Sequence, residues 1–184
     1  MVAHLQALDE RSRYLRFGYA ATDAQIARYV DTIDFERDEV FGIFNRRLDL
    51  IAMAHLAHHP GESAPGGRGT GSEFGVSVLP RGRRRGFGSR LFEHAMLHAR
   101  NRGVQTMFIH ALSENVPMLA IAKRAGATVQ RDGSESAAWL RLPPHSLASY
   151  LGELLGERAA EVDYQLKLQA HHMRDHFKPH RGRE

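Results

Sequence analysis

The chain has no cysteine and no long apolar run, and each of these absences excludes a class of protein. It also has only three lysines. Without cysteine there is no disulfide framework, no cysteine-ligated zinc or iron–sulfur site and no thiol nucleophile. The longest apolar stretch, residues 50–57, has the length of a strand and is far shorter than the roughly 18 residues of a membrane-spanning helix. The first ten residues lack the basic and apolar segments of a secretory signal. We therefore expect a cytoplasmic protein without membrane association.

The composition is that of an ordinary globular domain. The 184 residues are 42% hydrophobic and 25% charged, which is enough to form a substantial core in one domain with a small addition. The net charge is only +4, and 22 of the 25 basic residues are arginine. The one dense basic cluster, residues 81–85, is short and lies beside glycines, which suits a small phosphorylated ligand better than a nucleic acid. The charge pattern thus argues against nucleic acid as the main partner.

Hydrophobic periodicity predicts an α/β fold. We expect helices over residues 1–14, 23–30, 86–102 and 116–125, strands over 40–44, 49–57, 73–78, 104–112, 127–131 and 136–142, and a loop over 59–72. The order strand 73–78, helix 86–102, strand 104–112 forms a βαβ unit, so these two strands should be parallel.

A second region begins at the Pro143-Pro144 pair. We expect residues 1–142 to form the main domain and residues 143–184 to form a helical extension with an apolar face. Such a face needs a partner. It could cover an edge of its own sheet, or it could pair two copies of the chain, and the length of the segment favours a homodimer.

The strongest chemical signal is the loop between strand 73–78 and the following helix. A glycine-rich turn that starts a helix points several backbone N–H groups and the positive end of the helix at one place, which suits a phosphate or pyrophosphate. No Lys-Ser or Lys-Thr pair follows, which excludes a Walker P-loop. Leu91 stands where a dinucleotide fingerprint would have its third glycine. The alternative is a plain strand-to-helix turn.

This loop, Arg83-x-x-Gly86-x-Gly88, resembles the acyl-CoA pyrophosphate loop of the GNAT (Gcn5-related N-acetyltransferase) superfamily. Residues 114–127 resemble the second cofactor motif of that family, a helix that begins at asparagine and ends at glycine. Residues 12–17, 34–37 and 72–74 are similar to Pat-type bacterial protein lysine acetyltransferase domains. The resemblance spans residues 14–142 and implies a GNAT fold, in which a mixed sheet with parallel central strands is flanked by helices.

The chain departs from the family pattern in three places. The family's first strand should precede the first helix, whereas this chain starts with a predicted helix. Ala122 stands where many members have a tyrosine that protonates the leaving thiolate. The extension after Pro143 has no counterpart in the resemblance.

The resemblance implies an N-acetyltransferase that moves an acetyl group from acetyl-CoA to a primary amine, with a protein lysine as one possible acceptor. Glu73 matches the family's general base, and the small Gly75 and Ser77 on its face of the strand leave room for a substrate. Without cysteine the amine must attack the thioester directly. The expected cofactor-binding residues are Val76, Ser77, Val78, Arg83, Arg84, Arg85, Gly86, Phe87, Gly88, Ser89 and Asn115.

Other functions stay open. The acceptor could be a small-molecule amine, or the chain could be a degenerate GNAT module that binds acyl-CoA as a sensor or serves as an interaction domain. The missing tyrosine and first strand favour the degenerate module, whereas Glu73 and the intact loop favour catalysis. His172 and His176 have the spacing of a zinc-binding pair, but no glutamate follows His172, so we expect no metal site.

Overall fold

The computed structural model describes residues 1–59 and 70–143, which contain six strands and five α-helices. The helices are α1 (Val2–Gln6), α2 (Glu10–Phe17), α3 (Asp23–Asp31), α4 (Phe87–Asn101) and α5 (Val116–Arg124), with a single 3-10 turn at Pro80–Gly82. The strands are β1 (Glu39–Phe44), β2 (Leu50–His59), β3 (Gly71–Val78), β4 (Thr106–Leu112), β5 (Thr128–Asp132) and β6 (Glu135–Arg141). None of these helices is long and apolar enough to cross a membrane.

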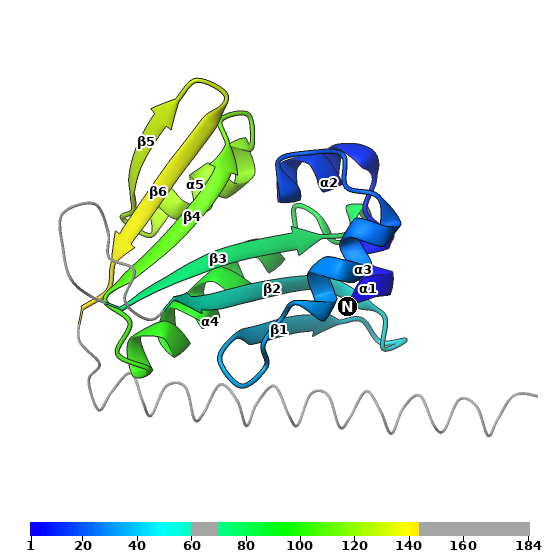
Figure 1. Ribbon diagram of the computed structural model, residues 1–184, viewed down its shortest axis with the longest axis horizontal. Coiled ribbons are helices and arrows are strands. Elements are labelled where there is room, and N and C mark those ends of the chain that lie inside the picture. The colour runs from blue at the N-terminus through cyan, green and yellow to red at the C-terminus, as the bar shows by residue number, and fades with distance from the viewer. Residues whose placement is uncertain (60–69, 144–184) are drawn as a thin grey trace, which may run out of the picture.

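The six strands form one mixed sheet in the order β1-β2-β3-β4-β6-β5 (Figure 1). Only β3 and β4 are parallel, and every other neighbouring pair is antiparallel. This confirms the predicted mixed sheet and the βαβ unit, because α4 connects the two parallel strands. The hairpin of β5 and β6 also follows the prediction, with Gly133 in a left-handed conformation (φ +57°) at its turn.

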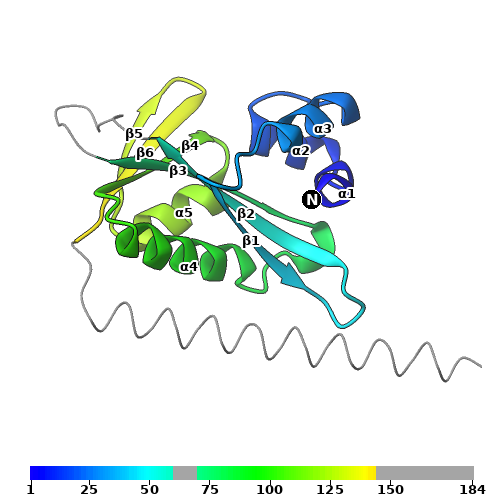
Figure 2. The ribbon, with the colours of Figure 1, turned by 60° about the horizontal axis from the view of Figure 1, so that its bottom comes forward.

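Helices cover both faces of the sheet (Figure 2). On one face α4 and α5 form the larger core with the strands, and its largest fully buried side chains include Phe74 and Phe92, whose rings pack edge to face 5.0 Å apart. On the other face α1 and α3 pack on Met53 of β2 and form a smaller core with Leu5 and Ile26. The two cores explain why the middle of β2 is apolar on both sides.

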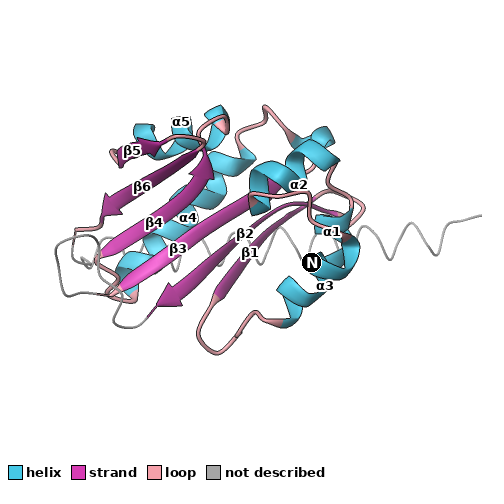
Figure 3. Ribbon diagram, turned by 45° about the horizontal axis from the view of Figure 1, so that its top comes forward, coloured by secondary structure: helices cyan, strands magenta, loops and turns pink. Residues whose placement is uncertain are grey.

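The two parallel strands stay together over only a short length. β3 pairs with β4 from Gly71 to Glu73, opposite Thr106 to Phe108. Beyond this point β3 continues along β2 to Val78, whereas β4 continues along β6. Figures 1 and 3 show the two strands diverging, with α2 over the open end. The sheet thus divides into two halves that remain joined near Glu73.

Two predicted boundaries were wrong. Residues 1–14 form two helices, because the carboxylate of Asp9 accepts hydrogen bonds from the backbone N–H (2.8 Å) and hydroxyl of Ser12 and starts a new helix there. The expected loop 59–72 is shorter at both ends, since β2 includes His59 and β3 begins at Gly71. These residues pair across the two strands, and this pairing outweighs the weak strand preference of small residues.

The described residues before β1 contain three helices and no strand, as the departure from the family pattern indicated. The predicted extension, residues 144–184, lies outside the described residues.

A buried carboxylate stabilises the start of β1. Asp38, whose side chain is 3% exposed, accepts hydrogen bonds from Arg37 (2.9 Å), His55 (3.2 Å) and the backbone N–H of His58 (3.2 Å). Burial by itself raises the pKa of this carboxyl, but these hydrogen bonds outweigh burial and lower the pKa from 3.8 to about 2.

We expect Asp38→Asn to lower the free energy of unfolding at pH 7 by about 2 kcal/mol, the value that corresponds to this pKa shift. The folded-state pKa is depressed, so the stabilisation is present above pH 3.8 and is lost as the pH falls towards 2. Urea unfolding of both proteins at a series of pH values measures the difference. A difference that stays constant down to pH 2 would contradict the prediction.

Candidate active site

A cleft of about 670 Å³ lies where β3 and β4 diverge. Its walls come from the two strands, from the end of α2, from the start of α5 and from the β5–β6 hairpin. The lining residues include Arg16, Glu73, Gly75, Val76, His110, Asn115, Asp132 and Glu135. Strand divergence leaves backbone N–H and C=O groups of β3 without a partner strand, so this wall offers hydrogen bonds to a ligand.

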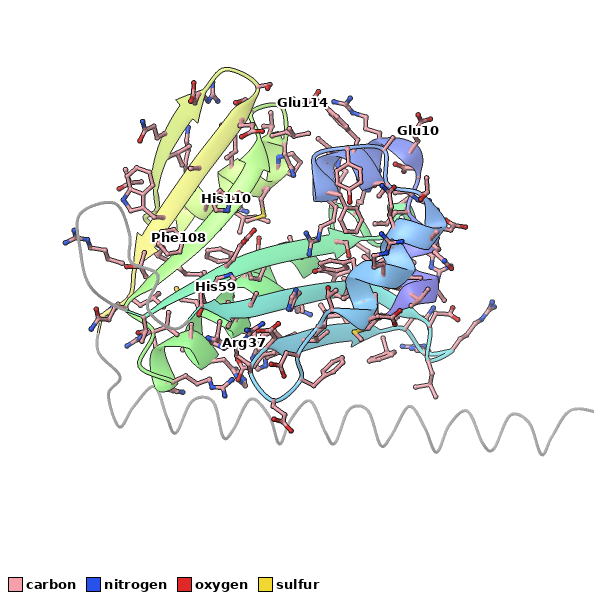
Figure 4. All side chains as sticks on the ribbon, viewed as in Figure 1. Glu10, Arg37, His59, Phe108, His110 and Glu114 are labelled. Carbon is pink, nitrogen blue, oxygen red and sulfur yellow. The ribbon has the colours of Figure 1, made fainter. Side chains whose placement is uncertain are left out.

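An ion pair lies at the junction of the two strands. His110 Nδ1 is 3.4 Å from Glu73 Oε1, and the side chains are 65% and 45% exposed. The hydrogen bond from His110 lowers the pKa of Glu73; burial opposes this effect, and the charges of His110, Arg16 and His59 add to it. The same hydrogen bond raises the pKa of His110, against burial. Glu73 is therefore ionised at neutral pH. Figure 4 labels His110 on β4.

Helix α2 contacts elements on both sides of the cleft. Arg11 forms an ion pair of 2.8 Å with Glu114, just before α5, and Asn115 donates from its amide to the backbone oxygen of Leu15 (3.3 Å). Figure 4 shows the labelled Glu114 facing α2. At the other end, Arg83 pairs with Asp9 (3.0 Å). The helix thus contacts both predicted cofactor motifs.

The arginine–glycine loop has the geometry of an anion-binding turn. Arg84 and Gly86 both have left-handed backbones (φ +60° and +77°), and α4 begins directly after Gly86. The first N–H with an intrahelical partner is that of Arg90, which donates to Gly86 O (3.0 Å), so the preceding turn of α4 has N–H groups available. Arg124 of α5 donates to the Ser89 hydroxyl (3.1 Å) and adds positive charge there. A Cβ at Gly86 would contact nothing within 4 Å. The loop is therefore open and electropositive.

The structure brings part of the predicted site together. Glu73, Val76 and Asn115 line the cleft, and Asn115 also caps α5 by accepting from the N–H of Met118 (3.3 Å). The side chain of Ser77 does not face the cleft, because it is buried and bonded to His4 (2.9 Å). The remaining predicted cofactor residues lie outside the cleft lining. They are Val78, which packs against the larger core, and Arg83, Arg84, Arg85, Gly86, Phe87, Gly88 and Ser89, which follow the end of β3.

Sequence reasoning missed several polar residues of the cleft, among them His110, Arg16, Asp132 and Glu135. His110 is the one polar side chain in the second half of the apolar run 104–112, and that exception was a usable signal. Arg16 was noticed only as part of a resemblance, and nothing in its local sequence indicates that it faces the cleft. Within residues 1–59 and 70–143, no three histidine, aspartate or glutamate side chains are placed to hold a metal ion.

The fold and the site together define a class of protein. A mixed sheet that opens between two parallel strands, beside a glycine-rich helix start, is the architecture of an acyltransferase of the GNAT type. The model of the acetyltransferase (GNAT) family matches residues 5–127, and the chain belongs to this family. A comparison with curated proteins gave no match.

Solved structures share this fold. The GNAT domain of the S. lividans PAT protein superposes with a TM-score of 0.61 at 22% identity, over 77% of this chain and 82% of that one. Arabidopsis thaliana NAA60, solved with a bisubstrate analogue, gives 0.59 at 15% identity, over 78% and 95%. A cAMP-binding acyltransferase from Mycobacterium smegmatis gives 0.50 at 25% identity, over 73% of this chain, which spans 41% of that protein.

We expect the pKa of His110 to fall when Glu73 is replaced by glutamine. The substitution keeps the shape of the side chain but removes the negative charge that stabilises the imidazolium. NMR titration of the imidazole signals measures the pKa in both proteins. Because the folded-state pKa of His110 is raised, the stabilisation from its charge is present below pH 6.5 while Glu73 is ionised, and it is lost as the pH rises through the folded-state value. An unchanged pKa in the variant would assign the shift to Glu135 instead.

Proposed function

We propose that the protein transfers an acetyl group from acetyl-CoA to a primary amine, with a protein lysine as the favoured acceptor class. The observation that supports this most is the ionised Glu73 at the junction of β3 and β4, inside a cleft that extends along the unpaired part of β3. Membership of the GNAT family supports the same reaction.

Glu73 would act on the acceptor. A lysine amine has a pKa of about 10.4 in water and is protonated at neutral pH, so it must lose a proton before it can attack. The carboxylate of Glu73 attracts the ammonium group and accepts this proton, directly or through a water molecule. Acetyl-CoA, when bound, supplies the activated acetyl thioester. Backbone N–H groups near Val76 would polarise its carbonyl oxygen, because β3 has no partner strand on that side beyond Glu73.

The residues present suit the diphosphate of CoA. The open space at Gly86, the available N–H groups at the start of α4 and the exposed arginines form a cradle for negative charge. Arg84, Arg85 and Arg124 would contact phosphate oxygens, and Phe87, Gly88 and Ser89 would donate backbone N–H groups. Val76 and Asn115, which line the cleft, would border the pantetheine arm.

One observation favours the alternative of a non-catalytic acyl-CoA sensor. Ala122, at the position where many relatives have the tyrosine acid, is fully buried in the larger core, so that position supplies no proton for the leaving thiolate. A small-molecule amine is the other alternative acceptor. Turnover separates the sensor from the enzyme, and a panel of acceptors separates the two classes of substrate.

We expect Glu73→Gln to lower the turnover of acetyl transfer by roughly a hundredfold, the usual contribution of a general base. The loss should be largest near neutral pH, where the acceptor amine is protonated, and CoA affinity should stay the same. Thiol release with a panel of amines and calorimetry with CoA measure the two quantities. Equal turnover of both proteins across the pH range would show that Glu73 is not the base.

We expect Ser89→Asp to weaken CoA binding by at least about tenfold, because it places a negative charge against the diphosphate. An acidic residue in the first turn favours the helix itself, so α4 should remain folded. Ser89→Asn, which is neutral and of the same size, is the matched control and should bind nearly as well as the parent. Calorimetric titration with CoA checks both, and equal affinity of the Asp and Asn variants would contradict the proposed diphosphate site.

The division into a domain of residues 1–142 and a helical extension of residues 143–184 stays a prediction, as does a homodimer formed through that extension.

A further inference from the structure

The guanidinium of Arg16 occupies a specific place on the wall of the cleft. It lies directly over Gly75 of β3, two residues beyond Glu73 on the same face of the strand. A Cβ at position 75 would come within 2.5 to 2.9 Å of three guanidinium atoms. The lack of a side chain at Gly75 therefore provides the space that this group fills.

A chain of hydrogen bonds holds the guanidinium there. Arg16 Nη2 donates to the Tyr29 hydroxyl (2.7 Å), which in turn donates to His55 Nδ1 (2.7 Å). His55 Nε2 donates to the buried carboxylate of Asp38 (3.2 Å). The guanidinium also lies 5.3 Å from the ring centre of Phe17 and 5.4 Å from that of Tyr29. The position of Arg16 is thus determined by contacts with α3 and β3, as well as by its own helix.

This anchoring uses little of the hydrogen-bonding capacity of Arg16. A guanidinium has five N–H donors, and among the described residues Arg16 makes one side-chain hydrogen bond and no ion pair. The nearest acid along β3 is Glu73, whose carboxylate is paired with His110. Arg16 therefore offers donors to a ligand in the cleft.

The charges of the cleft are arranged on opposite sides. Asp132 and Glu135 lie on the β5–β6 hairpin, and Glu73 lies at the strand junction, whereas Arg16 lies on the α2 side. An amine attracted to Glu73 would have acids on one side and a fixed guanidinium on the other. A cationic acceptor without an anionic group would gain nothing from Arg16.

We propose that Arg16 is a specificity-determining residue that binds a carboxylate of the acceptor. The acceptor would then be a primary amine with a carboxylate roughly 7 Å away, which is the separation of two residues along one face of a strand. A lysine next to an acidic residue and a small amino acid with a terminal amine share this chemistry. Tyr29 is a positioning residue, because it acts through Arg16. The inference rests on the proposed acetyl transfer.

The experiment compares acceptors that differ only in one charge. The small pair is δ-aminovalerate and its amide, and the peptide pair contains Lys-Asp or Lys-Asn in an otherwise identical blocked sequence. The kcat/KM of acetyl transfer is measured for each member. We expect the carboxylate member of at least one pair to be preferred about tenfold, the usual scale of a charge-assisted hydrogen bond. The pair that shows the preference identifies the source of the carboxylate.

Three variants test whether this preference belongs to Arg16. Arg16→Gln should abolish it by raising KM for the carboxylate member, so that the two members of a pair become equal in kcat/KM. Tyr29→Phe should reduce it in the same direction, without changing kcat for the neutral member. Arg28→Gln removes an equal charge from the exposed face of α3 and should retain the full preference.

Each outcome decides between the hypotheses. A preference that is equal in the parent and in Arg16→Gln would refute the role of Arg16, as would a parent enzyme that acetylates both members of each pair equally. Those two results would leave the proposed acetyl transfer intact. A folded parent protein that acetylates none of the four acceptors would count against both proposals.

Discussion

The short pairing of β3 with β4 is the constraint on which the site depends. If the two parallel strands stayed together over their full length, their backbone groups would satisfy one another and no cleft would exist. Beyond Glu73, β3 instead stays paired with β2, and β4 stays paired with β6. The sheet therefore opens beyond Glu73, and this residue marks the boundary between paired and unpaired backbone.

The N-terminal helices complete the opened sheet. The start of α2 is joined to the arginine–glycine loop through Asp9 and Arg83, and its side and end contact Glu114 and Asn115. The surface ion pairs in this arrangement contribute little stability individually. The ion pairs instead determine where α2 lies. This helix forms one wall of the cleft and also contacts both predicted cofactor motifs.

Buried negative charge at the start of β1 is neutralised by neighbouring basic side chains. Asp38 accepts from Arg37 and His55, and the half-buried Glu39 lies near His58, His98 and Arg102. Burial raises the pKa of Glu39, but the nearby His58, His98 and Arg102 outweigh it and lower the pKa to about 2. A carboxylate without such partners would be too costly to bury. The Asp38 group serves a second purpose, because its chain of hydrogen bonds ends at Arg16 in the cleft.

The sequence by itself determined the elements and the motifs whose causes are local. The cap at Asn115, the left-handed glycine before α4, the turn of the β5–β6 hairpin and the alternation around Glu73 each depend on interactions within a few residues. The resemblance to the GNAT family rested on the loop Arg83-x-x-Gly86-x-Gly88, on residues 114–127 and on the order of the elements. The break at Asp9 is also local, since its side chain caps α2, but the apolar residues before and after it predict one continuous helix.

Only the tertiary structure decided which of these residues meet. The pairing of Glu73 with His110 depends on the register of two parallel strands, and the placement of Arg16 on Gly75 depends on how α2 crosses β3. It also decided that the Ser77 side chain bonds His4 instead of facing a ligand. Periodicity shows which face of an element a residue occupies but not which distant element covers that face, since strand register and helix packing arise from the whole core.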